Sequence, residues 1–377
     1  MKLLVITENY FPYGSAMASR ILAFSKLFTE LRYDYHIIAL HGNDSELLNE
    51  NISFEIVNKK EKTSLETFIG NRKFVNRVKQ YIESNKLDYV FMISVHMHFN
   101  KINKICKKYN IKTIYELCEW YDPSSYNFKK FDIRYLRFNR NIKTKYHNVD
   151  GMVLISRLLY EYFDSKNMNI CRIPSICDVI NKKYSYDINN ERITIVFTGS
   201  TSKSKELIKP ILEALASNED YNKRISFDIY GINRNQLLNA VDNDAKLLDS
   251  LSSCVTANGF VQQNKIEDIL TNADYQIFIR PNRRSSNAGF PTKLCESFSA
   301  ATPVITNDTG DISLYLKDGY NGFICKGNSK EDIALVFDKI ISLDKENYRE
   351  LRKNARDTAL NSFDYRNYKD IIKDLFR

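Results

Sequence analysis

The amino-acid sequence predicts an α/β protein built from two Rossmann-like domains, each a doubly wound parallel sheet. Short runs rich in β-branched and aromatic residues alternate with longer segments of helical periodicity, which is typical of βα units. The length of 377 residues accommodates two such domains at about 100 to 200 residues each. A polar, aperiodic stretch at 178–192 marks the expected join, so we expect domains at 1–180 and 190–361.

Each domain shows its own series of expected strands and helices. In the first, a helix is expected from about Ser15, and the apolar runs that predict strands lie at 2–8, 35–40, 89–95 and 112–117. In the second, residues 205–217 have a helical period, and strands are expected at 194–199, 224–231, 274–280 and 302–308.

Composition excludes several classes of protein. Hydrophobic residues make up 43% and charged residues 27%, as in globular proteins rather than disordered or collagen-like chains. The longest apolar run, Tyr89 to Val95, is far shorter than the roughly 20 residues of a membrane span, and the N-terminus lacks a secretory cleavage site. Seven cysteines without a C-x-x-C pair indicate reduced thiols rather than disulfides or a zinc site. We therefore expect a cytoplasmic protein.

Positive charge is concentrated in the first domain. The net charge is +9, of which residues 1–180 carry +8. Nucleic acid, anionic lipid and a phosphorylated substrate are all candidate partners for such a domain. No nucleic-acid-binding motif is present, so we expect no nucleic acid. A nicotinamide-dependent dehydrogenase is also disfavoured, because the segment 8–19 after the first strand has one glycine and no G-x-G-x-x-G.

Four of only 12 glycines recur at the length of one βα repeat. Gly199, Gly231, Gly259 and Gly289 are separated by 32, 28 and 30 residues. A glycine just past a strand lets the backbone approach a ligand, and ligands of open α/β sheets bind at the carboxyl ends of the strands. Ordinary turns also use glycine, and this alternative remains open. Together the four predict that the second domain binds a nucleotide.

The segment from Ile279 to Ile305 has the features of a phosphate site. A strand end and a loop with three arginines precede Gly289, Phe290, Pro291 and Thr292, which open a predicted helix. The first-turn N–H groups of a helix and its dipole attract an anion, and Lys293 adds positive charge there. Glu296 lies three residues later on the same face, where it can accept hydrogen bonds from a ribose diol. A simple surface ion pair between Lys293 and Glu296 is the alternative.

GFPTKLCESFSAATPVITND, residues 289–308, resembles a segment of the glycosyltransferase family 4 enzymes, in which two glutamates separated by seven residues flank a Gly-Phe loop. Four further segments match in family order: FPYGSAMASRILAFSKLFTEL, ISRLLYEYFDSKNMNICRIPSICD, TIVFTGSTSKSKE and YLKDGYNGFIC. The resemblance implies a GT-B fold, in which two Rossmann-like domains face each other across a cleft. The C-terminal stretch 362–377 is expected to pack back on the first domain.

The resemblance also implies an activity. Enzymes of this family move a sugar, with retention of configuration and without a metal, from a nucleotide-sugar held mainly by the second domain to an acceptor held by the first. We expect a UDP- or GDP-linked donor as co-substrate, no other cofactor, and a glycan or lipid-linked acceptor, in cell-surface polysaccharide synthesis. A catalytically degenerate protein that serves as partner or scaffold of another transferase is the alternative.

Residue roles follow by position from the same resemblance. Lys205 corresponds to the phosphate-loop lysine after Gly199, and Glu296 to the second glutamate on the ribose. Charge on the leaving diphosphate is what Lys205 would neutralise. The other expected donor contacts are Gly14 near the diphosphate, backbone amides of Phe290, Pro291 and Thr292, and the nucleobase neighbours Gly259, Phe260 and Val261.

Two positions depart from the family pattern. Ala288 stands in place of the first glutamate, and Ser200 in place of an arginine beside the phosphate-loop glycine. We expect one of Arg280, Arg283 and Arg284 to replace the missing arginine. Asn287 is expected to contact the donor sugar, and the selectivity of the enzyme for its donor is expected to be altered.

The first domain offers carboxylates near the expected acceptor. In YELCEWYD, residues 115–122, Cys118 replaces the family's histidine, and Glu119 and Asp122 are the candidates to orient an acceptor hydroxyl or act as a base. Ordinary surface carboxylates are an equal alternative. His96 and His98 lie two residues apart on an expected strand and can face one side as metal ligands, but without a third ligand we expect no metal.

The segment 129–145 contains seven basic residues and one acid. As a helix it aligns Phe131, Tyr135, Phe138 and Ile142 in an apolar stripe flanked by cations. Such a helix can lie in the interface of an anionic membrane. Packing of the stripe on the domain core is an equal alternative.

Overall fold

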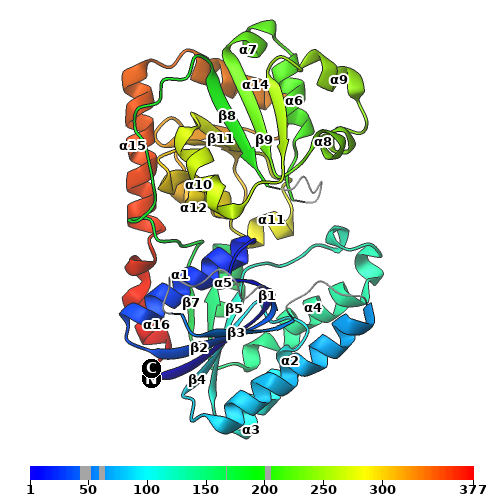
Figure 1. Ribbon diagram of the computed structural model, residues 1–377, viewed down its shortest axis with the longest axis vertical. Coiled ribbons are helices and arrows are strands. Elements are labelled where there is room, and N and C mark those ends of the chain that lie inside the picture. Colours follow the sequence, from blue (N-terminus) through cyan, green and yellow to red (C-terminus); the bar gives the residue numbers. More distant parts are fainter. Residues whose placement is uncertain (43–51, 59–63, 167, 200–204) are drawn as a thin grey trace. The chain divides into compact units, whose positions relative to one another are not determined.

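The computed structural model of the protein describes residues 1–42, 52–58, 64–166, 168–199 and 205–377, with the backbone alone for 64–71. The chain divides into two compact units (Figure 1). The N-terminal unit comprises Met1–Cys177 and Tyr365–Arg377, and the C-terminal unit comprises Asp178–Asp364. None of the described helices is both long and apolar enough to cross a membrane.

The N-terminal unit is a seven-stranded parallel sheet in the order β3-β2-β1-β4-β5-β6-β7. Its strands are β1 Lys2–Phe11, β2 Asp34–Gly42, β3 Phe54–Asn58, β4 Tyr89–Ile93, β5 Lys112–Leu117, β6 Gly151–Leu154 and β7 Ile170–Arg172. The helices that connect them are α1 Ala16–Glu30, α2 Ser64–Ser84, α3 Phe99–Lys108, α4 Ile133–Thr144 and α5 Arg157–Asp164. The strand order reverses direction between β1 and β4, so the ligand crevice of this sheet is expected at their carboxyl ends.

An aromatic cluster fixes the C-terminal segment to the N-terminal unit. Phe91 on β4 packs edge-on against Phe24, Phe28 and Phe376, with ring centroids 5.3, 5.8 and 5.9 Å away. Phe376 follows α16 (Lys369–Leu375), whose residues Ile372 and Leu375 are buried in the same core. Burying large aromatic side chains contributes on the order of 1.5–3 kcal/mol each, so this contact holds the end of the chain in place.

The C-terminal unit is a six-stranded sheet in the order β10-β9-β8-β11-β12-β13, again with parallel pairs. Its strands are β8 Ile193–Thr198, β9 Ile225–Tyr230, β10 Val255–Gly259, β11 Tyr275–Phe278, β12 Val304–Asn307 and β13 Gly322–Cys325. Its helices are α6 Lys209–Ala216, α7 Glu219–Arg224, α8 Arg234–Ala240, α9 Ala245–Ser250, α10 Gln263–Asn272, α11 Arg284–Ala288, α12 Thr292–Ser299, α13 Ile312–Tyr315, α14 Lys330–Ile341 and α15 Lys345–Ser362. The switch in strand order falls between β8 and β11.

A buried arginine attaches the long helix α15 to this sheet. Arg352 is fully buried, and its guanidinium donates hydrogen bonds to the carbonyl oxygens of Ala273, at 2.7 Å, and Ser185, at 2.8 Å. The Tyr348 ring packs against Tyr275 at 5.7 Å. A buried charge is tolerated only when its donors are satisfied, and these carbonyls satisfy them.

The predicted fold class is confirmed, and the strands expected in each half of the chain are present. Strands β3, β6, β7, β10 and β13 are not among the strands predicted from the sequence. Strands β6 and β7 have only four and three residues, and the edge strand β10 carries no buried side chain, so neither length nor hydrophobicity signals them.

The segment 129–145 differs from its prediction. The α-helix begins at Ile133, after a 3₁₀ turn at Lys129–Phe131 that places Phe131 outside the helix. Phe138 and Ile142 are buried in the domain core, whereas Phe131 is 78% exposed. The predicted stripe of 131, 135, 138 and 142 is therefore wrong as a single face, because its later members pack inward.

Candidate functional site

Three of the four recurring glycines form adjacent turns at the carboxyl edge of the C-terminal sheet. Gly199 follows β8 with a φ of +132°, Gly231 follows β9 with +103°, and Gly259 ends β10 with +71°. The Gly199 amide donates to the Tyr230 carbonyl at 2.8 Å, and the Gly231 amide to the Gly259 carbonyl at 2.7 Å. A Cβ atom on Gly231 would lie 2.5 Å from the carbonyl oxygen of Gly199, so the close approach of these two turns requires glycine.

The fourth glycine has a different place. Gly289 is buried and ends the short helix α11 with a φ of −97°, a conformation open to any residue. It precedes α12, which begins at Thr292 as the sequence predicts. Pro291 takes the N-cap position of α12, and no side chain from the described residues caps this end. Among the described residues, the amides of this first turn therefore receive no hydrogen bond from an N-cap side chain.

Lys293, in the first turn of α12, lies against the Gly199 turn. A Cβ atom on Gly199 would lie 3.0 Å from the Lys293 ammonium nitrogen, which forms an ion pair with Glu206 and lies 5.2 Å from the centroid of the Phe197 ring. The Lys293 side chain is only 17% exposed. A phosphate that reaches this turn would meet the ammonium at once and compete with Glu206 for it.

Glu296 lies on the same helix but does not pair with Lys293. Its Oε1 accepts a hydrogen bond from the Gln263 side chain at 3.4 Å, while Lys293 pairs with Glu206. Burial raises the pKa of the Glu296 carboxyl above its usual value, and the nearby ammonium groups of Lys182 and Lys293 oppose this shift. Lys293 and Glu296 therefore do not form the surface ion pair that was the alternative prediction. A partly buried carboxylate with one long hydrogen bond retains acceptor capacity for hydroxyl groups.

The arginine loop after β11 is braced by asparagines. The Arg280 amide donates to Asn307 Oδ1 at 2.8 Å, and its guanidinium donates to Thr309 Oγ1 at 3.2 Å. Asn287 Nδ2 donates to Asn282 Oδ1 at 2.9 Å, and Asn287 Oδ1 accepts from the Gly310 amide at 2.8 Å. Both ends of the Asn287 amide are thus engaged in holding the loop.

The remaining predicted donor residues differ in exposure. Ala288 is fully buried, and Phe290 packs its ring on Tyr315 and Phe363 at 5.3 and 5.7 Å, which leaves only its backbone to offer. Phe260, just after β10, is 85% exposed, and Val261 is partly buried. Arg283 is the N-cap of α11, and Arg284 is its first residue. Lys205 lies exposed in the turn directly before Glu206, and Ser200 lies outside the described residues.

In the N-terminal unit, Glu8 organises the turn after β4. Its carboxylate accepts hydrogen bonds from the amides of His96, Met97 and His98 at 3.0, 3.0 and 2.7 Å, and from the His98 ring at 2.8 Å. Burial acts to raise the pKa of Glu8, but the His98 hydrogen bond and the charges of His96 and His98 hold it below its usual value. Glu8 is not among the functional residues predicted from the sequence. An acid at the end of an apolar strand beside the switch point was the available signal.

His96 and His98 lie in a loop rather than on the expected strand. β4 ends at Ile93, and His98 is the N-cap of α3. Burial lowers the pKa of His96, whose Nδ1 lies 2.9 Å from the Tyr115 hydroxyl and 3.2 Å from that of Tyr146. Within the described ranges no three His, Cys, Asp or Glu side chains come together as metal ligands. Both histidines are hydrogen-bonded.

The segment after β5 brings the other predicted carboxylates to the same edge. Cys118 is buried, which raises the pKa of its thiol well above the usual value. Glu119 is partly buried, and its charge acts on the pKa of His96, as does that of Glu8. Asp122 is the N-cap of a 3₁₀ turn at Pro123–Ser125, and Gly14 lies in the loop between β1 and α1 with a φ of +95°. Glu8, His96 and Glu119 thus form a cluster of ionisable side chains beside the carboxyl ends of β4 and β5, which we call the titratable cluster.

The family of the chain follows from its second unit. Residues 178–358 match the family described as "Glycosyl transferases group 1", over the segment that contains the donor-site residues predicted for the C-terminal unit. The protein belongs to the group 1 glycosyltransferases. As a glycosyltransferase of this family it transfers a sugar from a nucleotide-sugar. Comparison with curated protein sequences gives no match.

Solved structures similar to this glycosyltransferase confirm the GT-B fold. HepE of Anabaena, in complex with UDP and glucose, is 14% identical and has a TM-score of 0.73, covering 99% of this chain and 98% of its own. Sucrose-phosphate synthase of Thermosynechococcus elongatus is 11% identical, with a TM-score of 0.75 over 100% and 98% of the two chains. A mutant of S. aureus TarM in complex with fondaparinux, alpha-GlcNAc-glycerol and UDP is 12% identical, with a TM-score of 0.73 over 100% and 99%.

Proposed function

We propose that this glycosyltransferase moves a hexosyl group from a UDP- or GDP-linked donor to a hydroxyl group of a glycan or a lipid-linked acceptor, in cell-surface polysaccharide synthesis. The observation that carries the proposal is the Lys293 ammonium against the Gly199 backbone at the switch point of the C-terminal sheet. UDP is the favoured nucleotide, because HepE and TarM were solved with UDP.

Each part of the donor has a matching group in the C-terminal unit. The diphosphate would take the Lys293 ammonium from Glu206 and receive amide hydrogen bonds from the first turn of α12. Glu296 would accept hydrogen bonds from the ribose diol, since it has free acceptor capacity. The exposed Phe260 ring offers a surface for the nucleobase. Lys293 and Lys205 together would stabilise the charge that develops on the leaving diphosphate.

The acceptor would bind at the titratable cluster of the N-terminal unit. Glu119 is the group that we assign to orient the acceptor hydroxyl, with Asp122 beside it in the chain. The partly buried, hydrogen-bonded His96 and Glu8 would set the charge around Glu119. Ala288 removes one carboxylate from the donor side, which we expect to alter donor selectivity rather than abolish transfer. We also propose a cytoplasmic location, since the seven scattered cysteines of the sequence include no C-x-x-C pair.

The decisive experiment is turnover on a panel of UDP- and GDP-sugars. Purified protein is incubated with each donor, and release of the nucleoside diphosphate is measured with and without oligosaccharide acceptors. We expect release from one nucleotide class, and loss of that release in Glu296→Ala. Binding of a nucleotide without release from any donor would favour the degenerate scaffold, and an unchanged rate in Glu296→Ala would refute the assigned site.

A further inference from the structure

Helix α4 packs one face into the core of the N-terminal unit, and its other face exposes large apolar side chains to solvent. Phe138 and Ile142 are buried, and the Phe138 ring contacts His96 and Tyr121 at 4.7 and 5.2 Å, which anchors the helix to the sheet. On the outward side Ile133 is 78% and Leu136 is 51% exposed. Such large aliphatic side chains in water are costly, and a group of them marks an interaction surface.

The preceding 3₁₀ turn enlarges this apolar group. Phe128, which is the N-cap of the turn, and Phe131, which is its last residue, are 73% and 78% exposed and lie within a few residues of Ile133. The Lys130 ammonium lies 5.2 Å from the centroid of the Phe131 ring. Four large, exposed apolar side chains therefore fall within residues 128–136, a segment that also carries cations. We call this set, Phe128, Phe131, Ile133 and Leu136, the apolar edge.

Arginines continue the outward face of α4. Positions 133, 136, 137 and 140 repeat at intervals of three and four, so Arg137 and Arg140 line up with the apolar edge along one side of the helix. In the part of the chain that the structure describes, no carboxylate lies within ion-pair distance of Arg137, Arg140 or Lys145. Arg134 is different, because Asp132 holds it through two hydrogen bonds of 3.0 and 2.7 Å.

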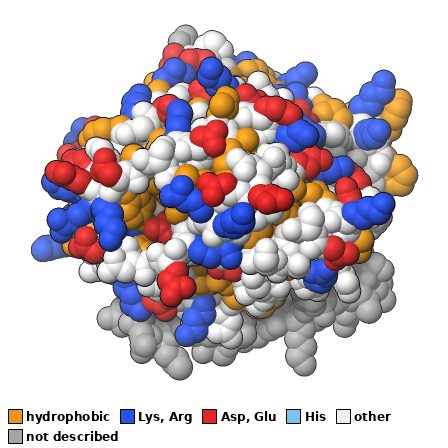
Figure 2. All heavy atoms as spheres, turned by 90° about the horizontal axis from the view of Figure 1, so that it is seen from above, with side chains coloured by type: hydrophobic (Ala, Val, Ile, Leu, Met, Phe, Trp, Pro, Cys, Tyr) orange, Lys and Arg blue, Asp and Glu red, His pale blue; other side chains and the backbone are white. Residues whose placement is uncertain are grey.

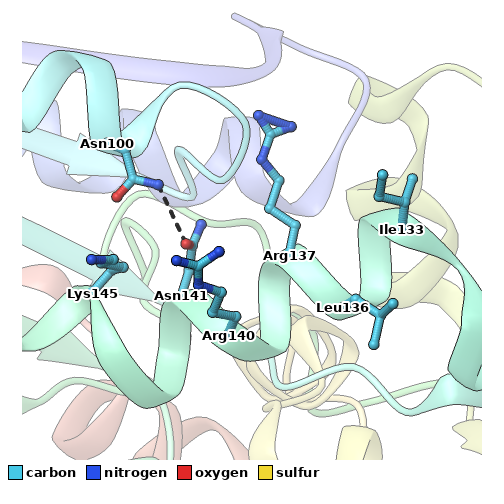
Figure 3. Close-up of a pocket in the computed structure, with 7 residues that line it drawn as sticks. All are labelled: Asn100, Ile133, Leu136, Arg137, Arg140, Asn141 and Lys145. Carbon is cyan, nitrogen blue, oxygen red and sulfur yellow. Dashed lines mark hydrogen bonds between the residues drawn. The ribbon is translucent and has the colours of Figure 1, made fainter.

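A cavity of about 330 Å³ lies along this face (Figure 3). In Figure 3 Ile133 and Leu136 line one end, while Arg140 and Lys145 line the other, and Arg137 projects between them. The dashed line at its side is the hydrogen bond that Asn100 Nδ2 donates to Asn141 Oδ1 at 3.4 Å. The cavity thus has an apolar end and a cationic end, which is the polarity of a phospholipid: acyl and glycerol carbons beside a phosphate.

The distribution of charge elsewhere on the molecule is different. Figure 2 shows the face seen from above in Figure 1, on which blue and red side chains alternate and orange ones lie singly or in small groups. On α7 of that end, Lys223 and Arg224 each lie within 3.9 Å of an acidic side chain four residues earlier. Balanced charge of this kind is typical of a solvated surface, whereas the α4 face combines unbalanced positive charge with exposed apolar groups.

We propose that the α4 face docks on an anionic phospholipid membrane, with the apolar edge in the headgroup boundary and a lipid phosphate in the cavity beside Arg137, Arg140 and Lys145. The combination of positive charge with exposed apolar side chains favours the membrane over an acidic protein or a nucleic acid. A nucleic acid would neutralise the arginines but leave the apolar edge in water, whereas a bilayer satisfies both. Docking of this kind is independent of the transfer reaction and would bring a lipid-linked acceptor to the enzyme.

The test is flotation of the full-length protein with vesicles of phosphatidylcholine alone and with phosphatidylglycerol added. We expect binding only to the anionic vesicles, weakened by high salt because surface charges are screened. Each basic residue near an anionic surface contributes about fivefold in affinity, so Arg137→Ala/Arg140→Ala should bind about 25-fold more weakly. Phe131→Ser/Ile133→Ser should also weaken vesicle binding, and the size of this loss in affinity should change little with salt concentration.

The matched control is Lys223→Ala/Lys246→Ala, which removes the same charge from exposed positions on α7 and α9. It should bind vesicles like the wild type. Melting temperature and UDP binding check that every variant is folded. Absence of binding to anionic vesicles, or an equal loss in the control, would overturn the proposal. So would binding to DNA or to free glycerophosphate, lost in Arg137→Ala/Arg140→Ala, without vesicle binding.

Discussion

Replacement of Gly231 by alanine tests the glycine turns at the carboxyl edge of the C-terminal sheet, where we propose that the donor binds. At a φ of +103° an alanine is strained by about 1–3 kcal/mol. Its Cβ would also lie 2.5 Å from the Gly199 carbonyl oxygen and 2.9 Å from the carbonyl carbon, so the two turns must separate. Overpacking of this kind costs about 1–3 kcal/mol more. We therefore expect Gly231→Ala to lower the free energy of unfolding by about 2–6 kcal/mol.

Gly319→Ala is the matched control for backbone strain. Gly319 lies in the same unit with a φ of +73°, and a Cβ atom there would meet no atom within 4 Å. Only the left-handed conformation is penalised, by about 1–2 kcal/mol. Urea unfolding gives the two free energies, and titration calorimetry gives the UDP affinity.

Because the displaced atoms of Gly199 lie beside Lys293, Gly231→Ala should also weaken UDP binding by more than about tenfold, whereas Gly319→Ala should leave it unchanged. Equal destabilisation by the two variants would refute the close approach. A destabilised Gly231→Ala with wild-type affinity would show that the turn does not hold the nucleotide.

Four further predictions concern charged groups. Lys293→Met should weaken UDP binding at least about tenfold in calorimetry, because a charge-assisted contact to phosphate is lost, while Glu206→Gln should strengthen it by freeing the ammonium. Glu296→Gln should raise the free energy of unfolding, measured in urea, at neutral pH, and this gain should vanish in acid. The pKa of Glu296 is raised in the folded protein, so ionisation of this carboxyl as pH rises through the unfolded and then the folded pKa favours unfolding. Glu8→Gln should be destabilised at neutral pH and approach the wild type as pH falls through the lowered pKa of Glu8, where the wild-type carboxylate is itself protonated; a pH-independent difference in unfolding free energy would contradict this. Glu119→Ala should lower kcat more than it raises the Kd for the donor, and equal losses would remove Glu119 from the acceptor site.

The fold and the glycine turns at the carboxyl edge of the C-terminal sheet could largely be predicted from the sequence. The spacing of Gly199, Gly231 and Gly259 reflects the βα repeat, which local sequence encodes directly. The conformation of Gly289 could not be predicted, because a glycine with a φ of −97° cannot be told in the sequence from one that needs a positive φ. The partner of Lys293 was also inaccessible, because Glu206 is 87 residues away and only tertiary packing brings the two together.

The N-terminal unit shows the limits of periodicity. A helical pattern indicates which residues share a face but not which face turns inward, so the predicted stripe of α4 mixed the buried Phe138 with the exposed Phe131. The length of β4 was overestimated for a related reason. The apolar run continues to Val95, but the backbone turns at Ser94, which has a φ of +52°. Glu8 then accepts hydrogen bonds from the amides of the turn.

The most direct test of the donor site is calorimetric titration of UDP and GDP into the wild-type protein and Glu296→Ala, with Gly319→Ala as the folded control. We predict one binding site, selective for one nucleotide, with affinity reduced at least about tenfold in Glu296→Ala and unchanged in Gly319→Ala. No binding of either nucleotide, or equal binding by wild type and Glu296→Ala, would contradict the assignment of the nucleotide-sugar site to the carboxyl edge of the C-terminal sheet.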